Sequence, residues 1–263
     1  MSDFGNDEAM KLPSFGVFCA QIVKDLIYFR RNAAISFDVL IKQIYFTSVE
    51  ALGLCTLLSL LLGAVIIVEG HQILAAIGQT DWIYKILIFA LIRDLGPFII
   101  CLVVVARSGT AISTELGNMK VNKEIDALVT MGISPISYLV SPRVVGMIVS
   151  LLILMSYFLM SGIFGGFLIS NLFQNIPFLD FFARLLNELS LADIVIMFFK
   201  LVLSGFYIAA ICSYQGLSAQ TAYTEVPQRN IKAVGGTVIS VCLVNLIGSL
   251  LYFFVTGLNE VGI

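Results

Sequence analysis

Residues 106–132 read ARSGTAISTELGNMKVNKEIDALVTMG, a polar segment that stands between two long apolar runs. The chain around it has 263 residues, of which 59% are hydrophobic and only 12% are charged. Soluble domains contain about 45–50% apolar and about 25% charged residues. The composition therefore indicates an integral membrane protein, in which residues 106–132 connect two membrane-spanning segments.

The apolar runs are long enough to serve as spans. A bilayer core is about 30 Å thick, and a helix needs roughly 20 apolar residues to cross it. The sequence predicts an all-α fold with five transmembrane helices, at about residues 51–68, 86–106, 144–170, 194–213 and 233–258. We expect residues 1–45 to form a cytoplasmic tail and an interfacial helix. Residues 46–263 are expected to form the five-helix membrane domain.

Lysine and arginine are distributed unevenly between the two sides of the membrane, and the richer side usually faces the cytoplasm. Eleven of them lie in the N-terminal segment and the connections at 107–143 and 214–232, which share one side. These eleven are Lys11, Lys24, Arg30, Arg31, Lys42, Arg107, Lys120, Lys123, Arg143, Arg229 and Lys232. The other side holds only Lys85 and Arg184. We therefore expect the N-terminus in the cytoplasm and the C-terminus outside.

Two segments beside the spans carry apolar side chains at helical spacing. In residues 15–29 an apolar face opposes Lys24, Arg30 and Arg31, a pattern typical of a helix that lies on a membrane surface. Residues 172–189 show a similar pattern on the opposite side of the membrane. We expect an interfacial helix in each place.

The segment quoted first contains the signals of a short helix that is bounded at both ends. Asn122 is a good N-cap, and Glu124 falls in the first turn, where a negative charge favours the helix dipole. Gly132 is a natural helix C-cap, and Pro135 follows three residues later. The sequence therefore predicts a helix over about residues 123–131.

This predicted helix has an apolar face formed by Ile125, Leu128 and Val129. One interpretation is that the face packs on the protein's own helices. The other is that it docks into a groove on a cytoplasmic partner, as amphipathic helices do. The residues alone leave both interpretations open.

Two charged residues fall inside the second predicted span, about one third of its length from the outer side: Arg93 and Asp94. An ionisable residue at depth costs about 2.5–3.5 kcal/mol on insertion scales and is retained mainly where it pairs or lines a cavity. Neighbours on an α-helix point about 100° apart, so we do not expect these two to pair with each other. The expected partners are Glu69 or His71, at the outer end of the first span, or a lipid headgroup.

Two other features of the spans have a structural interpretation. Lys200, in the fourth span, is expected to extend its ammonium group to the outer surface. Gly162 and Gly166 form a GxxxG pattern in the third span, which predicts close helix packing within one subunit or between two.

Several classes of function are disfavoured by what the sequence lacks. It has no GxxxxGK[ST] motif for ATP phosphates, and its single histidine belongs to no hydrolase-like or metal-binding cluster. A net charge of −2 does not suggest a nucleic-acid partner. The five cysteines lie in apolar surroundings without CxxC spacing, so we interpret them as small hydrophobic residues. The N-terminus lacks the features of a signal peptide and is expected to remain unprocessed.

The stretch RDLGPFIICLVVVARSGTAISTELGNMKVNKEIDALVTMGISPISYLVSPR, residues 93–143, resembles the core motif of the MlaE permease family. The family pattern runs approximately RELGP, then AGR-G-A--AE-G-M, then E-IDAL--MGI-P--YLV-PR. The chain matches it at Arg93, Leu95, Gly96, Pro97, Arg107, Gly109, Ala111, Glu115, Leu116, Gly117, Met119, Glu124, Met131, Pro135, Pro142 and Arg143. Members of this family are membrane subunits of ABC transporters that work with MCE proteins to move lipids.

The resemblance implies the permease subunit of an ATP-driven lipid transporter, with phospholipid as the expected substrate, in a bacterial inner membrane. It implies a homodimer, a separate cytoplasmic ABC ATPase that binds the ATP, a periplasmic ring of MCE protein and a periplasmic C-terminus. No cofactor is expected in this chain itself. The coupling residues that would meet the ATPase are Glu115, Glu124, Ile125, Leu128 and Val129. The expected lipid-binding residues are Ile66, Glu69, Ile73, Leu74, Ile77, Arg93 and Asp94.

The chain departs from the family pattern in three places. Glu69 stands where the family usually has Gln, Asp94 replaces the usual Glu, and the connection at 214–235 is diverged. Two other functions therefore stay open: a secondary transporter with a proton or ion relay through Glu69, Arg93 and Asp94, and a non-transporting scaffold subunit. Association with an ATPase and an MCE protein would favour the lipid transporter over both.

Overall fold

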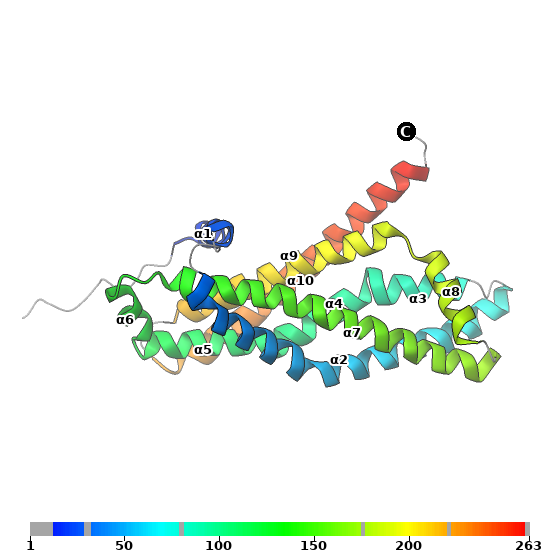
Figure 1. Cartoon of the computed structure of the whole chain (residues 1–263), viewed down its shortest axis with the longest axis horizontal. Coiled ribbons are helices and arrows are strands. Elements are labelled where there is room, and N and C mark those ends of the chain that lie inside the picture. The colour runs from blue at the N-terminus through cyan, green and yellow to red at the C-terminus, as the bar shows by residue number, and fades with distance from the viewer. Residues whose placement is uncertain (1–12, 29–32, 79–81, 175–176, 220–221, 261–263) are drawn as a thin grey trace, which may run out of the picture.

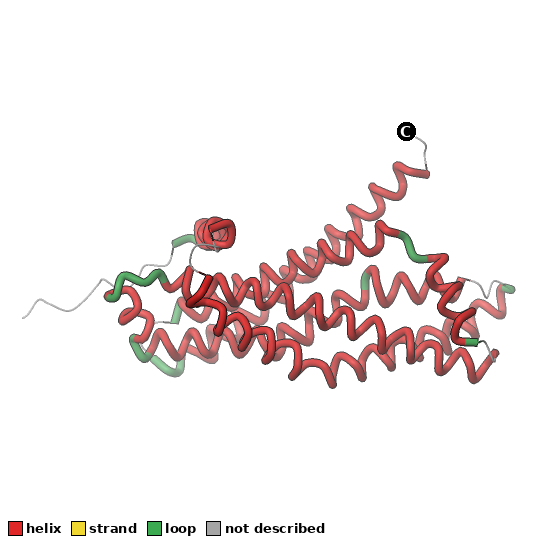
Figure 2. Tube along the Cα trace, viewed as in Figure 1, coloured by secondary structure: helices red, strands yellow, loops and turns green. Residues whose placement is uncertain are grey.

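The computed structural model describes residues 13–28, 33–78, 82–174, 177–219 and 222–260 (Figure 1). These residues are helical almost throughout, and no strand occurs among them (Figure 2). Five helical stretches are long and apolar enough to cross a membrane, and each overlaps one predicted span. They are Leu40–Leu74, Trp82–Val121, Ile136–Leu172, Leu191–Leu217 and Glu225–Phe254. The predicted all-α fold with five spans is confirmed.

The second span and the start of the third contain wider, π-helical turns between α-helices. The α-helices are α1 (Phe15–Tyr28), α2 (Ala33–Ile77), α3 (Trp82–Ile88), α4 (Leu95–Val104), α5 (Thr110–Val121), α6 (Glu124–Thr130), α7 (Ser141–Gln174), α8 (Phe178–Glu188), α9 (Leu191–Leu217) and α10 (Glu225–Glu260). The π-helical turns are η2 (Phe89–Arg93), η3 (Val105–Gly109) and η4 (Ile136–Val140). Helix α2 begins inside the region expected to hold only a tail and an interfacial helix.

The connecting helices are divided between the two ends of an elongated bundle. Helices α1 and α6 lie at one end, and α8 lies at the other (Figure 1). The N-terminal helix and the 106–132 segment therefore share an end, as the charge distribution predicts. The C-terminal end of α10 extends away from the bundle (Figure 1), and the helix exposes apolar side chains such as Leu246, Leu250 and Phe253. Which end faces the cytoplasm stays a prediction.

Helices α2 and α7 pack so closely that glycine is required at their contact. A Cβ atom on Gly63 of α2 would lie 2.1 Å from the carbonyl oxygen of Gly162 and 3.1 Å from the amide nitrogen of Gly166, both on α7. Beside these glycines the hydroxyls of Ser59 and Ser161 are hydrogen-bonded to each other. The GxxxG pattern is therefore used within the chain, between the first and third spans.

The regular helix of the second span breaks at Asp94. Its backbone (φ −126°, ψ −63°) separates η2 from α4, and its N–H donates to the carbonyl of Phe89, five residues back, at 3.1 Å. A Cβ on Gly96 would lie 1.9 Å from the Leu91 carbonyl oxygen, so the tight break needs a glycine there. The break also places Arg93 Nε 3.4 Å from Asp94 Oδ2. The expectation that these neighbours cannot pair was wrong, because it assumed an unbroken α-helix.

The two amphipathic segments are helical but use part of their apolar faces against the bundle. In α1, Phe18 and Ile22 are fully buried, and the Phe18 ring packs edge-on against Tyr214 of α9 at 5.4 Å. In α8, Phe181 and Leu185 are buried. Their location at the membrane surface stays a prediction, and Phe29, Arg30 and Arg31 lie outside the described residues.

Candidate functional site

A buried ion pair joins three spans at the break in the second one. Lys200 of α9 is fully buried, and its Nζ donates to Asp94 Oδ1 at 2.6 Å, to the Arg93 carbonyl at 2.8 Å and to Ser249 Oγ of α10 at 3.0 Å. All three ammonium donors are thus used. The Ser249 hydroxyl donates in turn to the Asp94 carboxylate. Lys200 does not extend to the outer surface as expected, because the break in the second span gives it partners inside the bundle.

The backbone of α10 makes room for this lysine. A Cβ on Gly248 would lie 2.5 Å from Lys200 Cε and 2.7 Å from its Cγ, so the aliphatic stem lies directly against the glycine. The sequence-based expectation named Glu69 and His71 as partners for the charges of the second span. The structure gives Asp94 a partner on the fourth span instead.

Arg93 has a different environment, although it adjoins the ion pair. Its guanidinium carbon lies 4.6 Å from the ring centre of Phe89 and 4.0 Å from that of Tyr252. Two such cation–π contacts hold a guanidinium in place without neutralising it. Asp94 meets Arg93 only at 3.4 Å and gives its shorter contact to Lys200. About a quarter of the Arg93 side chain, 26%, remains exposed.

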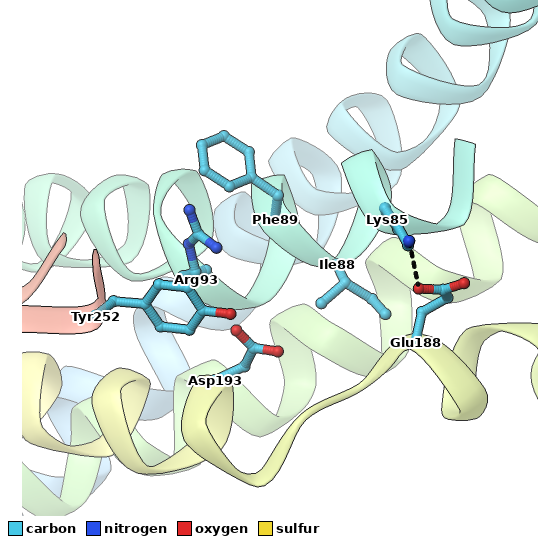
Figure 3. A pocket seen from close by; sticks show the side chains of 7 residues that line it. All are labelled: Lys85, Ile88, Phe89, Arg93, Glu188, Asp193 and Tyr252. Atoms are coloured by element: carbon cyan, nitrogen blue, oxygen red, sulfur yellow. Dashed lines mark ion pairs between the residues drawn. The ribbon is translucent and has the colours of Figure 1, made fainter. Parts of the chain in front are cut away.

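The exposed part of Arg93 opens into a pocket of about 220 Å³ (Figure 3). The pocket lies between α3 and η2 of the second span, the end of α8, the start of α9 and the part of α10 around Tyr252. It is lined by Lys85, Ile88, Phe89, Arg93, Glu188, Asp193 and Tyr252. Arginine presents several donors in a planar fork that matches the oxygens of carboxylate and phosphate groups. The pocket can therefore bind an anionic group, and no metal-binding group of three side chains occurs among the described residues.

The expected lipid-binding residues of the first span lie elsewhere. Ile66 and Leu74 are partly buried against the core, whereas Glu69 and Ile73 are exposed. The side chain of Ile77 lies outside the described part of the structure. Among the expected lipid-binding residues whose side chains the structure describes, only Arg93 and Asp94 are brought to the pocket and its buried ion pair.

Sequence reasoning missed the residues that complete the pocket. Tyr252 and Asp193 come from the fifth and fourth spans, and Lys85 of α3 pairs with Glu188 of α8 at 3.6 Å. Asp193 and Tyr252 are polar residues near the ends of apolar runs, and such residues can indicate a functional site. Their spacing, however, does not indicate which other span they face.

At the other end of the bundle, helix α6 is capped differently from the prediction at its start. The N-cap position is Lys123, whose φ of 62° is left-handed, while Asn122 ends α5 and accepts a 2.5 Å hydrogen bond from the Tyr223 hydroxyl. The predicted Asn122 cap was wrong, because the chain must turn sharply between two helices there. The Gly132 prediction is confirmed: its φ is 76°, and its N–H donates to the Val129 carbonyl at 2.9 Å.

One part of the apolar face of α6 packs against the rest of the protein, and another part is exposed. Ile125 is fully buried and Leu128 packs partly against the core, whereas Val129 is 46% exposed. Glu115 forms a 2.9 Å ion pair with the buried Arg143 at the start of α7. Glu124 accepts a 3.3 Å hydrogen bond from the Asn122 side chain. Ile125 is thus a core residue and offers no surface to a partner.

Comparison with known proteins relates the chain to membrane permeases. The sequence profile described as "Permease MlaE" matches residues 40–251. A probable ABC transporter permease protein of Rickettsia typhi is 27% identical over 82% of this chain and 83% of its own. The intermembrane phospholipid transport system permease protein MlaE of Haemophilus influenzae is 25% identical over 75% of this chain and 76% of its own. The chloroplastic protein TRIGALACTOSYLDIACYLGLYCEROL 1 of Arabidopsis thaliana is 26% identical over 90% of this chain and 66% of its own. With a match that spans all five membrane helices, the chain belongs to the MlaE permease family.

Proposed function

We propose that this protein is the permease subunit of an ATP-driven transporter that moves phospholipid at a bacterial inner membrane. In this proposal two copies form the membrane unit, a separate ABC ATPase binds and hydrolyses ATP on the cytoplasmic side, and a ring of MCE protein receives or delivers lipid in the periplasm. The Haemophilus relative, named for intermembrane phospholipid transport, supports the substrate class.

The observation that carries the proposal is the environment of Arg93. Its charge is held between two aromatic rings beside a pocket, while the neighbouring carboxylate is satisfied by Lys200. A guanidinium held in this way can donate hydrogen bonds to a phosphate group, whose oxygens match its planar fork. Asp94 and Lys200 then act as positioning residues, because they fix the break that orients Arg93.

The same span offers a mechanical route from the ATPase to the pocket. Helix α6 is fixed to α5 by the buried Ile125 and by a 2.7 Å ion pair between Lys120 and Asp126. Helix α5 continues through η3 and α4 to Asp94 without an intervening loop. When ATP binding draws the ATPases together, a displacement of α6 is expected to move the second span and to alter the pocket at Arg93.

Replacing Arg93 tests the proposed lipid site. Arg93→Ala is expected to lower the amount of phospholipid that co-purifies with the protein by about tenfold, the effect of one lost charge-assisted contact. The fold should persist, because Lys200 still pairs with Asp94. Arg93→Lys should restore the load only in part, since an ammonium lacks the planar fork. The measurement is a lipid extraction and mass spectrum of each purified protein. A normal lipid load in well-folded Arg93→Ala protein would exclude this site.

Replacing Val129 tests the coupling surface on α6. Val129→Asp places a carboxylate on the exposed part of the helix, and desolvating it in an interface is unfavourable. The co-purified ATPase is expected to fall by about tenfold or more, while the permease stays folded. Val129→Thr, which keeps the shape without the charge, is the matched control, and Ile125→Asp should instead unfold the α5–α6 region. Wild-type amounts of ATPase on the Val129→Asp protein would place the docking surface elsewhere.

A further inference from the structure

We infer that the Arg93 pocket selects phospholipids whose headgroup carries a primary ammonium as well as the phosphate, of the phosphoethanolamine type. The inference rests on the proposed function and adds the headgroup. It comes from the acidic side chains of the pocket, Asp193 and Glu188, which a phosphate group alone would not use.

The pocket carries charges of both signs in equal number. Arg93 and Lys85 are positive, and Asp193 and Glu188 are negative (Figure 3). The adjoining Asp94 and Lys200 also cancel each other. A site built only for a phosphate would gain from an excess of positive charge, as in anionic-lipid sites formed by basic clusters. A balanced site instead matches a zwitterion, whose phosphate and ammonium both need a partner when they leave water.

The two carboxylates lie where an ammonium could reach them beside a phosphate on Arg93. Asp193 is buried, and its Oδ2 accepts a 3.1 Å hydrogen bond from the Ser190 N–H. Figure 3 shows the Tyr252 hydroxyl directed toward Asp193, so the aromatic ring that holds Arg93 also reaches the carboxylate. Glu188 is partly exposed and meets Lys85 at a loose 3.6 Å, so it can accept a further donor. An ionised carboxylate has about four acceptor positions, which leaves capacity at both residues.

The aromatic residues argue against a quaternary ammonium in this position. Trimethylated ammonium groups are recognised by free aromatic faces, because they have no hydrogen to donate. Here Phe89 and Tyr252 already hold the guanidinium of Arg93. The remaining acceptors are carboxylates, which suit the three N–H donors of a primary ammonium.

The size of the pocket agrees with a headgroup and not with a whole lipid. Its volume of about 220 Å³ is below the ~300–1,000 Å³ of sites that enclose complete small molecules. The acyl chains would therefore lie outside it, along apolar helix surfaces.

A competition between headgroups tests the inference. The purified full-length protein would be equilibrated in mixed micelles with equal amounts of phosphatidylethanolamine, phosphatidylglycerol and phosphatidylcholine that have identical acyl chains, and the retained lipids measured by mass spectrometry. We expect wild-type protein to retain phosphatidylethanolamine in about tenfold excess over each competitor, the ratio that one additional charge-assisted contact supplies. Glu188→Gln and Asp193→Asn should each reduce this ratio toward one. Asp180→Asn, on the same outer helix but outside the pocket, should leave it unchanged.

The outcomes separate the headgroup inference from the proposed function. Equal retention of the three lipids, lost in Arg93→Ala, would overturn the inference and leave the lipid site in place. A preference that survives both carboxylate substitutions, or one for phosphatidylglycerol, would also overturn it. Failure of wild-type protein to retain any phospholipid would instead contradict the proposed function. Glu188→Gln changes a partly exposed side chain, so the test stands even if Asp193→Asn does not fold.

Discussion

Lys200→Met is expected to destabilise the folded protein by about 3–5 kcal/mol, the usual cost of removing one partner of a buried ion pair. The substitution leaves the Asp94 carboxylate with only the Ser249 hydroxyl and the 3.4 Å contact to Arg93 Nε, and it leaves the Arg93 carbonyl without its lysine donor. Thermal unfolding in detergent, followed by circular dichroism, would show a markedly lower midpoint or no cooperative transition.

The double variant Asp94→Asn with Lys200→Met separates lost charge balance from lost packing. It should recover part of the stability, because the Asp94 carboxylate no longer stands without its lysine partner and the amide oxygen can still accept from Ser249. Lys232→Met, which removes an exposed lysine, should change the midpoint little. If Lys200→Met unfolds like the wild type, the ion pair does not hold these three spans together.

Gly63→Ala is expected to destabilise the protein by about 1–3 kcal/mol, although alanine normally favours a helix over glycine by about 1 kcal/mol. The reason is the Gly162 carbonyl oxygen, which would lie 2.1 Å from the new methyl group and belongs to the backbone, so it can move only with α7. The same unfolding experiment measures the effect.

Gly53→Ala is the matched control, because it lies on the same helix and its Cβ would have nothing within 4 Å. It should leave stability unchanged or raise it. The opposite signs of two identical substitutions on α2 would locate the close contact at Gly63. Equal effects at both positions would contradict the α2–α7 packing.

The division of the chain into spans followed from the sequence because hydropathy and length are local properties. Each predicted span overlaps a membrane helix, and Gly132 ends α6 as its freedom to adopt a positive φ suggests. These features depend on a residue and its near neighbours. They need no knowledge of which helices touch.

The pairing of charges did not follow from the sequence, because it depends on a local break and a distant contact. The wide turn at η2 brings Arg93 toward Asp94, and only the packing of α9 against it shows that Lys200 is the partner. The same limitation applies to Ile125 and Val129, which share an apolar pattern but differ completely in exposure. Periodicity identified the face of α6, and tertiary packing decided how much of it remains free.

The most direct test of the central proposal is ATP-dependent movement of phospholipid by the permease together with its ATPase. The complex would be reconstituted in vesicles with fluorescent phospholipid, and transfer to an acceptor carrying the MCE protein would be followed over time. We expect transfer that requires ATP, that stops when the ATPase is inactive, and that falls about tenfold with Arg93→Ala. Transfer driven by a proton or ion gradient without ATP, or none in a fully assembled complex that hydrolyses ATP, would contradict the proposal.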